Sequence, residues 1–458
     1  MIIKKIDLRI EFYKLLDFLK EHSCPFLLDS GNNYKKLGKF SFIGFDPLII
    51  FQAKDRQVEI IEHGKLNKFY SQNSIDDFQK IINKYKKIYN ARFPFSGGFA
   101  GFLSYDLCRS IEKIPSAALD DKNMPDICFG LYDGIFIYDH KERETYIAAH
   151  GIENSANHVI EKLEYIAGLA NKRGSDDCFF ENIPKKINFK SDLSKKEYLI
   201  KVDKLKSYIK NGDIFQTNLT RRFEAESFED SWMLYQKLRS INPAPFSAYF
   251  DYKDFQIISS SPERFIKVKK NRIETRPVKG TVARGSNKRD DVRNKQKLLD
   301  SEKDKSELVM IVDVSRNDLG RISEIGTVKV KQLFALEKYP TVYHLVSTVT
   351  GKLRQNIEFS DIIRATFPGA SITGAPKIRA MEIIDEIEPV RRNIYTGSIG
   401  YIDLNGNIDL NIAIRTMILK NNKIFFQVGG AVVWDSDRLS EYRETMVKGK
   451  ALFRAVKQ

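Results

Sequence analysis

Residues that form disulfides and soft-metal sites are scarce in this chain. Its 458 residues include 4 cysteines and 6 histidines. Cys24, Cys108, Cys128 and Cys178 are scattered and form no Cys-x-x-Cys pair, which argues against a zinc site and against a disulfide framework. We therefore expect free thiols in a reducing, cytoplasmic protein.

Long hydrophobic runs are also missing. No apolar segment approaches the roughly 20 residues that span a bilayer as a helix. The first residues, MIIKKIDLRIEFYKLL, are too charged for a signal peptide. We expect a soluble protein that has no membrane partner.

Positive charge is in excess, but the basic residues are not gathered in one part of the sequence. The formal net charge is +15, and the surplus lysines alternate with acids, as in KKNRIETRPVKGTVARGSNKRDD. There is no basic tail, zinc-finger spacing or RNA-binding signature. A lysine-rich solvated surface explains this pattern better than a nucleic-acid partner does.

The order of strand-like and helix-like segments predicts two regions. Residues 1–185 alternate short apolar strands, such as FSFIGFDPLIIFQA, with helical stretches. Residues 172–190 are polar and aperiodic, as in a linker or a surface loop. Residues 190–458 contain many further strands joined by short turns. We predict an α+β fold, a sandwich of two large, mainly antiparallel β-sheets flanked by helices.

Local signals define several elements of the second region. Ser194 and Glu197 have the spacing of a capping box, and Gly212 ends the helix that they begin. Asn405-Gly406 and residues 420–423 are typical of hairpin turns.

Lys279 and Glu263 are the residues with the clearest catalytic potential. Lys279 lies in TRPVKGT, shortly after Glu263 in SPERF. The two segments have the pattern of one hairpin, which would bring the amine and the carboxyl group onto adjoining strands. A lysine can act there as a nucleophile while the acid protonates the leaving group.

The last predicted helix, residues 437–456, has three distinct faces, and Asp435 or Ser436 can cap it. The predicted core face comprises Leu439, Tyr442, Met446, Gly449, Phe453 and Val456. Another face carries Glu441, Glu444 and Lys448 together with Ala451 and Ala455. The alanines indicate that something packs closely against this acidic face, although an exposed Glu444–Lys448 pair would also fit the spacing.

A second acidic group occurs in the helix SEKDKSELVMIVD, where Asp304 and Glu307 share a face. Two helices that present carboxylates, without cysteine or histidine nearby, would suit magnesium. Acids that only balance neighbouring lysines are the alternative for each helix alone.

Two glycine clusters and two isolated polar residues complete the candidates. Residues 369–377 (GASITGAPK) lie between two helices, where their amides can form an anion cradle. Gly429-Gly430 follows a strand and indicates a close approach of backbone to ligand, or a bulge. His344 beside an apolar run is typical of a hydrogen-bonded core residue. Arg415 at the centre of the strand-like IAIRTMI needs an anionic partner.

Together these segments resemble the chorismate-utilising family, which includes the first components of aminodeoxychorismate synthase and anthranilate synthase. The matching segments, in family order between residues 212 and 448, are GDIFQTNLTRRF, NPAPFSAYF, SSSPERF, TRPVKGT, SELVMIVDVSRNDLGR, YHLVSTV, PGASITGAPKIRAMEIIDEIEP, RRNIYTGSIGY, IAIRT, GGAVVWDS and EYRET. The first region matches more weakly, through PFLLDS and PFSGGFAGFLSYDL.

The resemblance implies a chorismate site that holds Mg²⁺. Glu307, Glu441 and Glu444 would hold the metal ion, which would bind the ring carboxylate. The implied substrate-binding residues are Gly280, Thr281, His344, Thr373, Gly374, Tyr395, Arg415, Gly429, Gly430 and Lys448.

Lys279 would decide the reaction. Family members that make 4-amino-4-deoxychorismate carry lysine here, and those that make anthranilate typically carry alanine. The resemblance therefore implies covalent catalysis by Lys279 with Glu263 as the acid, leading to 4-aminobenzoate and folate. The chain contains neither a glutamine amidotransferase domain nor a lyase domain, so we expect ammonia from a glutaminase partner and pyruvate release by another enzyme.

Two further features qualify the resemblance. Ala431 stands where relatives usually have a third glycine. Ser30, Pro245, Phe246 and Ser247 match a pocket that holds tryptophan in the family, although ordinary core packing would also explain them.

Three alternatives remain beside aminodeoxychorismate synthesis. The first is anthranilate synthesis, including dual use, and the second is a non-catalytic scaffold or regulatory subunit. The retained Glu263, Lys279, Glu307, Glu444 and Arg415 argue against the scaffold. The third, a nucleic-acid binder, rests on net charge alone.

Overall fold

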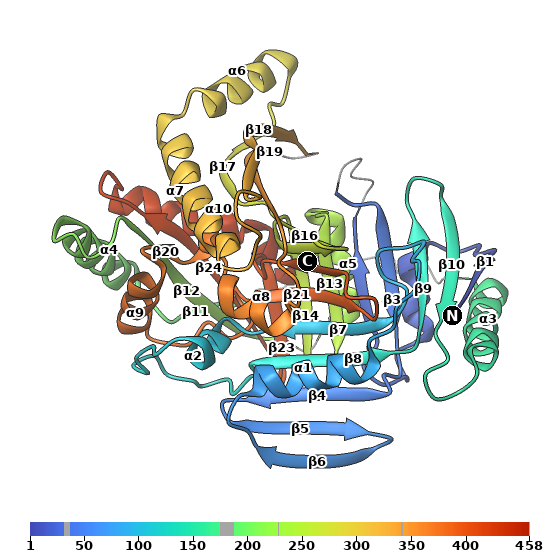
Figure 1. Ribbon diagram of the computed structural model, residues 1–458. Coiled ribbons are helices and arrows are strands. Elements are labelled where there is room, and N and C mark those ends of the chain that lie inside the picture. Colours follow the sequence, from blue (N-terminus) through green and yellow to red (C-terminus); the bar gives the residue numbers. More distant parts are fainter. Residues whose placement is uncertain (32–36, 175–186, 228, 340–341, 458) are drawn as a thin grey trace.

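The computed structural model describes residues 1–31, 37–174, 187–227, 229–339 and 342–457 (Figure 1). It contains two twelve-stranded β-sheets. Neighbouring strands within each sheet pair antiparallel in every case described. Helices cover the outer faces, and the predicted α+β sandwich is confirmed.

Sheet I has the spatial order β1-β10-β9-β3-β2-β13-β14-β23-β24-β12-β11, and β20 also pairs with β12. The bounds are β1 Ile2–Ile6, β10 Glu144–Ala149, β9 Gly134–Asp139, β3 Phe40–Gly44, β2 Phe26–Asp29, β13 Phe246–Asp251, β14 Phe255–Ser261, β23 Thr416–Lys420, β24 Lys423–Val432, β12 Gln216–Glu226, β11 Lys190–Ser191 and β20 Gly374–Ala375.

Sheet II has the order β17-β19-β16-β15-β22-β21-β7-β8-β4-β5-β6, and β18 also pairs with β19. The bounds are β17 Val278–Ala283, β19 Val342–Lys352, β16 Arg272–Thr275, β15 Arg264–Lys269, β22 Ile408–Asn411, β21 Ser398–Asp403, β7 Gly98–Leu103, β8 Ile127–Tyr132, β4 Ile49–Lys54, β5 Gln57–Glu62, β6 Lys65–Tyr70 and β18 Lys329–Lys338.

The helices form the outer layers of the sandwich. Their bounds are α1 Ser74–Tyr85, α2 Cys108–Ile111, α3 Ala156–Arg173, α4 Lys195–Lys210, α5 Ser231–Ile241, α6 Lys288–Leu299, α7 Glu302–Gly320, α8 Phe359–Thr366, α9 Lys377–Ile387 and α10 Arg438–Lys457, with short 3₁₀ helices at Phe12–Phe18, Tyr105–Leu107 and Ala370–Ile372. One apolar core joins α3, α5 and α10 to sheet I, and another joins α1, α7 and α8 to sheet II. A third, aromatic core fills the space between the sheets.

Both sheets combine strands from the two predicted regions. In sheet I, β2 pairs with β13, so that Leu27 lies opposite Tyr249. In sheet II, β7 pairs with β21, so that Phe102 lies opposite Ile399. Residues 1–185 and 190–458 therefore share both sheets, and much of the predicted linker lies outside the described residues.

The chain crosses between the sheets at two neighbouring places. Residues 262–263 join β14 of sheet I to β15 of sheet II, and residues 412–415 join β22 of sheet II to β23 of sheet I. The Ile412 amide donates a hydrogen bond to the Glu263 carbonyl at 3.0 Å, and the Ser260 amide donates to the Arg415 carbonyl at 3.1 Å. The two crossovers thus hold one another in place.

These crossovers correct two predictions. Glu263 and Lys279 do not share a hairpin, because β15 pairs with β16 whereas β17 pairs with β19. Arg415 does not lie at the centre of a strand. It lies in the second crossover with a φ of 52°, and the nearby Ala413 and Met417 are buried because the crossover passes through the sandwich.

Helix α10 corrects the prediction of the core face. Leu439 and Met446 are 38% and 41% exposed, whereas Glu441 and Thr445 are buried. Polar residues can face the interior here because they are hydrogen-bonded: Ser436 donates to Glu441 at 2.7 Å, and Arg221 donates to Thr445 at 3.0 Å. The close packing that the alanines predicted is confirmed at the buried Ala455.

Other local predictions fare better. The Ser194–Glu197 capping box is present, and the turns at Asn405-Gly406 and residues 420–423 close hairpins. The start of α10 differs, because Asp437, rather than Asp435 or Ser436, accepts from the Ser440 amide at 2.9 Å. This side chain begins one residue before the helix and therefore reaches its first free amides.

Two further expectations concern the whole chain. Cys24, Cys108 and Cys128 are buried free thiols, and Cys178 lies outside the described residues. Within the described ranges, no helix is both long enough and apolar enough to cross a membrane.

Candidate active site

Lys279 lies in β17, with its side chain only 13% exposed. Its ammonium is 3.6 Å from the Glu307 carboxylate of α7. Burial lowers the pKa of Lys279, Glu307 opposes that effect, and the neighbouring Lys448 reinforces it. Lys279 therefore loses its proton, and becomes a neutral nucleophilic amine, more easily than a surface lysine does.

Glu263 lies in the first crossover, where it is 5% exposed. Burial raises the pKa of Glu263 to about 7, and a hydrogen bond from Ser371 partly offsets the increase. The Val278 amide donates to the Glu263 carboxylate at 3.4 Å. Because Val278 precedes Lys279, this contact places an acid that can be protonated at neutral pH beside the amine.

The acidic faces of α7 and α10 converge near these two residues. Lys303 of α7 bridges the helices, with its ammonium 3.9 Å from Glu307 and 3.6 Å from Glu441. Glu444 pairs with Lys448 at 2.7 Å. Burial, together with the neighbouring Glu444, raises the pKa of Glu441. Cations thus occupy the space between carboxylates that would otherwise repel one another.

Glu307, Glu441 and Glu444 offer the oxygen ligands that magnesium prefers, but their ligand atoms do not all lie close enough together to enclose an ion. Among the described residues, only Glu62, His63 and Glu153 bring three ligand atoms within 4.8 Å of one another, and that group joins the β5–β6 turn to the loop before α3. Mg²⁺ usually keeps several waters and needs only one or two protein carboxylates plus substrate oxygens. The oxygen donors on the two helices therefore fit the ion.

Gly430 explains how the acidic face of α10 approaches sheet I. A side chain at this position would begin 3.2 Å from a Glu441 oxygen, 3.6 Å from a Glu444 oxygen and 3.7 Å from the Lys448 ammonium. Lys448 also donates to the Gly429 carbonyl at 3.0 Å. Both glycines lie within β24 rather than after it, so the predicted close approach is present but the predicted position at the strand end is wrong.

His344 lies on β19, opposite Thr281 of β17. Its Nδ1 atom is 2.8 Å from the Thr281 hydroxyl. Burial and the nearby Arg415 lower the pKa of His344 to about 3, so the ring is neutral at physiological pH. Gly280, between Lys279 and Thr281, has a φ of 73°, and a side chain there would begin 2.9 Å from Asp304 of α7.

The loop that carries Thr373 and Gly374 is fixed by a buried ion pair. Arg392 pairs with Glu388 at 2.7 Å and donates to the Ile372 carbonyl at 2.9 Å. A Cβ atom on Gly374 would lie 2.2 Å from a β12 carbonyl, which requires glycine. The pair thereby ties this loop to the segment that holds Tyr395, whose hydroxyl has a raised pKa because it is buried.

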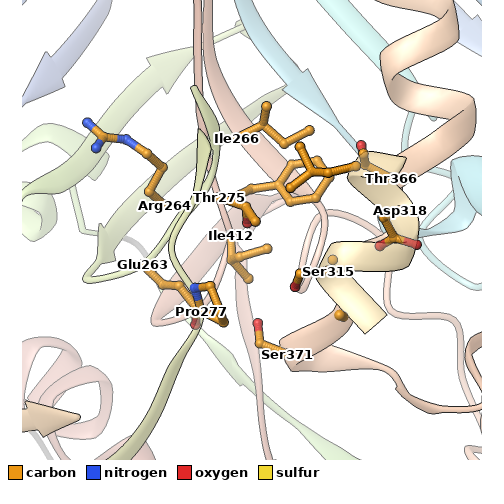
Figure 2. A pocket seen from close by; sticks show the side chains of 14 residues that line it. Glu263, Arg264, Ile266, Thr275, Pro277, Ser315, Asp318, Thr366, Ser371 and Ile412 are labelled. Atoms are coloured by element: carbon orange, nitrogen blue, oxygen red, sulfur yellow. The ribbon is translucent and has the colours of Figure 1, made fainter. Parts of the chain in front are cut away.

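Figure 2 shows a small cavity beside Glu263. Its volume is about 20 Å³, enough for about one water molecule. Ser371, Ser315 and Asp318 line it together with Glu263. Asp318 pairs with Lys377 at 2.6 Å, so the cavity combines an apolar lining with a few polar groups beside the acid.

Three residues near the site were missed at the sequence level. Ser371 donates to Glu263, and Lys303 bridges the two acidic helices. Gln216 is fully buried, and both polar atoms of its side chain lack a hydrogen-bond partner in the described part of the chain. Lys303 precedes Glu307 by four residues, a spacing that could have revealed it. Gln216 and Ser371 lie in family motifs, but nothing in their spacing marks them.

Ser30, Pro245, Phe246 and Ser247 do meet around one cavity. It has a volume of about 290 Å³ and lies between the sheets. It is separate from Lys279, although Arg264, the residue after Glu263, also lines it. The predicted pocket is therefore present, and its ligand is a separate question.

The family model described as chorismate binding enzyme matches residues 24–454, which is most of the chain. The chain belongs to the chorismate binding enzyme family. The family assignment makes it a chorismate-utilising enzyme, and Lys279, Glu263 and the acidic helices lie within the matched range.

Similar curated members of the family carry two different names. The chain is 38% identical over 448 residues to aminodeoxychorismate synthase component 1 of Bacillus subtilis, covering 97% of this chain and 94% of that protein. It is 37% identical to aminodeoxychorismate synthase component 1 of Escherichia coli, covering 92% and 91% of the two chains. It is also 36% identical to anthranilate synthase component 1 of Acetivibrio thermocellus, covering 96% and 91%.

A solved structure of the family has the same architecture. Anthranilate synthase component I from Streptococcus pneumoniae superposes with a TM-score of 0.81 at 32% identity, over 92% of this chain and 93% of that one. The Escherichia coli isochorismate synthase MenF, at 15% identity, has a TM-score of 0.72 over 99% and 94% of the two chains. The latter similarity extends to the fold alone.

Proposed function

We propose that this protein is the chorismate-converting subunit of an aminodeoxychorismate synthase, which makes 4-amino-4-deoxychorismate from chorismate and ammonia for 4-aminobenzoate and folate synthesis. One observation carries the proposal. Lys279 is a buried amine with a lowered pKa, and Glu263, with a pKa of about 7, accepts a hydrogen bond from the residue next to it.

In the first step, the neutral Lys279 amine attacks C2 of the ring. The two ring double bonds shift, the C4–O bond breaks, and Glu263 donates its proton so that the hydroxyl leaves as water. The products are a secondary ammonium adduct at C2 and an ionised Glu263.

In the second step, ammonia attacks C4 and the ring double bonds shift back. The C2–N bond breaks, and Lys279 leaves as a neutral amine. The new C4 ammonium returns a proton to the Glu263 carboxylate, which restores the acid. Protons and charges balance over the cycle, and no oxidant or reductant is needed.

The remaining site residues would hold the substrate. Arg415 and Lys448 would pair with its carboxylates, while Thr281, Tyr395 and neutral His344 offer polar contacts around the ring. Glu307, Glu441 and Glu444 would hold Mg²⁺, which when bound would neutralise a substrate carboxylate. Equilibrium dialysis should show Mg²⁺ binding that weakens in Glu444→Gln, and wild-type-like binding by that variant would contradict the ligand assignment.

Ammonia would come from a partner. Two similar proteins are named component 1 of aminodeoxychorismate synthase, a name that implies a second component. We expect that component to be a glutamine amidotransferase, and we expect a separate lyase to release pyruvate from the product. The low cysteine content and the free thiols fit a cytoplasmic enzyme.

Anthranilate synthesis is the second candidate, because component 1 proteins of that name are 36% and 35% identical to this chain. Lys279 favours the first candidate, since a lysine nucleophile at C2 would occupy the carbon that anthranilate synthesis must aminate. A non-catalytic scaffold is disfavoured, because it would not need a buried lysine beside a protonatable acid.

Product identification separates these functions. The purified protein is incubated with chorismate, MgCl₂ and ammonium chloride, with and without an aminodeoxychorismate lyase. We expect 4-amino-4-deoxychorismate, which becomes 4-aminobenzoate when the lyase is added. Anthranilate as the main product would overturn the proposal, and a folded, magnesium-loaded protein without turnover would favour the scaffold. Glutamine in place of ammonium should give no product until a glutaminase partner is added.

A further inference from the structure

Lys303 contacts two of the three carboxylates that the proposed function assigns to Mg²⁺. Its ammonium is 3.9 Å from a Glu307 oxygen on its own helix, α7, and 3.6 Å from a Glu441 oxygen on α10. Lys305 shows the more ordinary arrangement, since it pairs with Glu302 of the same helix at 3.0 Å. Lys303 instead bridges the two acidic helices.

The two distances show that charge holds this ammonium to the carboxylates. Neither distance is short enough for a hydrogen bond, so both contacts are Coulombic and have no fixed direction. The side chain of Lys303 is 52% exposed, and its ammonium can therefore turn into water at little cost.

The other two lysines of the site are held more firmly. Lys279 has a side chain that is only 13% exposed. Lys448 is 2.7 Å from Glu444 and also donates to the Gly429 carbonyl at 3.0 Å. Of these three ammonium groups, Lys303 is therefore the one that can most easily move away.

The three ammonium groups also balance the charge of the site. Three carboxylates, with a formal charge of −3, are matched by three lysines, with a formal charge of +3, so the sum is zero. A divalent cation that joins this neutral group gains little net attraction, because the ammonium groups repel it at short range. Removing the charge of Lys303 alone leaves a sum of −1, which attracts the ion.

From these contacts, the exposure of the side chain and the charge balance, we propose that Lys303 is a displaceable competitor of the metal ion at Glu307 and Glu441. Its ammonium must leave the two carboxylates for Mg²⁺ to take them as ligands. Lys303 thereby lowers the metal affinity that the carboxylates alone would give. Because these glutamates and Glu444 are the metal ligands of the proposed function, the inference rests on that function.

Metal binding by charge variants of Lys303 tests the competition. Equilibrium dialysis measures Mg²⁺ binding to the full chain without chorismate, so turnover does not enter the measurement. Lys303→Met removes the charge but keeps much of the length of the side chain, and should bind Mg²⁺ about tenfold more tightly than the wild type. Lys303→Arg keeps the charge and should stay within about twofold of the wild type.

Two further variants locate the effect. Lys305→Met removes a charge from the same helix, one that pairs with Glu302, and should change Mg²⁺ affinity less than about twofold. Lys303→Met combined with Glu444→Gln should bind Mg²⁺ more weakly than Lys303→Met alone, which would place the gain at this site. Circular dichroism checks the fold of each variant, and Lys303→Gln replaces Lys303→Met if the latter does not fold.

Unchanged or weaker Mg²⁺ binding by Lys303→Met would overturn the inference. Equal tightening by Lys305→Met would also overturn it, because the cause would then be the net charge of the protein. If the wild type and all variants fail to bind Mg²⁺ at millimolar concentration, the metal assignment and the competition are both wrong. The synthesis of 4-amino-4-deoxychorismate is judged separately, by the products that the wild type forms from chorismate.

Discussion

Two charged regions lie on either side of the same crossover, and they handle charge differently. Around Lys279 the signs alternate: Lys279, Lys303 and Lys448 interleave with carboxylates on α7 and α10. Around the inter-sheet cavity, arginines hold the acids: Asp409 accepts from Arg264, and Asp29 accepts from Arg239. Glu263 and Arg264, adjacent in the chain, belong to the first and the second region.

This difference separates chemistry from structural support. Interleaved charges can hold an amine and an acid near neutrality, because each ammonium is offset by carboxylates and each carboxylate by burial. An arginine–carboxylate pair cannot tune an acid–base pair in that way, because the guanidinium stays protonated, but it holds neighbouring elements in place. The predictions below test the two halves of this contrast, beginning with the largest expected effect.

Lys279→Ala should reduce formation of 4-amino-4-deoxychorismate by at least about 10³-fold, because it removes the proposed nucleophile. Lys65→Ala, at an exposed position on β6, is the matched control and should retain wild-type turnover. Initial rates with ammonium as the nitrogen source measure both. Unchanged product formation in Lys279→Ala would show that Lys279 is not the nucleophile.

Glu263→Gln should lower kcat by about 10²–10⁴-fold, because the amide cannot donate the proton that the leaving hydroxyl needs. The wild type should lose activity as the pH rises through about 7, where Glu263 ionises. The residual activity of the variant should lack this decline. A wild-type kcat profile that stays flat from pH 6 to pH 8.5 would argue against Glu263 as the acid.

Arg264→Met should destabilise the fold by about 3 kcal/mol, because it removes a buried guanidinium and leaves the half-buried Asp409 carboxylate without its partner. The double variant with Asp409→Asn should recover part of the loss. Arg316→Met breaks an exposed pair on α7 and should cost less than about 0.5 kcal/mol. Urea unfolding measures all three, and equal effects of the two single variants would mean that Arg264 contributes no more than a surface residue.

Glu263→Gln should also stabilise the folded state at high pH. Burial raises the pKa of Glu263 from an ordinary 4.5 to about 7, so its favourable contribution is complete below pH 4.5 and is lost as the pH rises through 7. At pH 8 the variant should therefore gain about 3 kcal/mol of unfolding free energy, and at pH 4 it should gain none. A gain that is the same at both pH values would show that ionisation is not its cause.

Much of the fold and the site could be predicted from local patterns. The hairpin at Asn405-Gly406 and the capping box at Ser194 follow from short-range chemistry, and both were found. The alternation of apolar residues also predicted the antiparallel sheets. The acidic residues on α10 were predicted as a separate face, and Gly430 was predicted at a close approach.

The incorrect predictions concern places where long-range topology determines the structure. The residues around Arg415 are apolar whether the segment is a strand or a crossover between sheets, because both pack inside the protein. The apolar pattern alone therefore could not distinguish the two. Glu263 and Lys279 were expected on one hairpin because they are close in sequence, although β17 pairs instead with β19. Leu439 and Met446 were placed in the core because an apolar stripe does not reveal that Glu441 and Thr445 have hydrogen-bond partners inside the protein.

The shared sheets also constrain how the chain is made. Leu27 cannot pair with Tyr249, nor Phe102 with Ile399, until the ribosome has synthesised the later strand. During synthesis, β2 and β7 therefore expose unpaired edges for most of the time that the chain is growing, and long-range pairing of this kind is slow and prone to aggregation. A nascent chain that stops before β13 would present these edges permanently, so truncated products should depend strongly on chaperones.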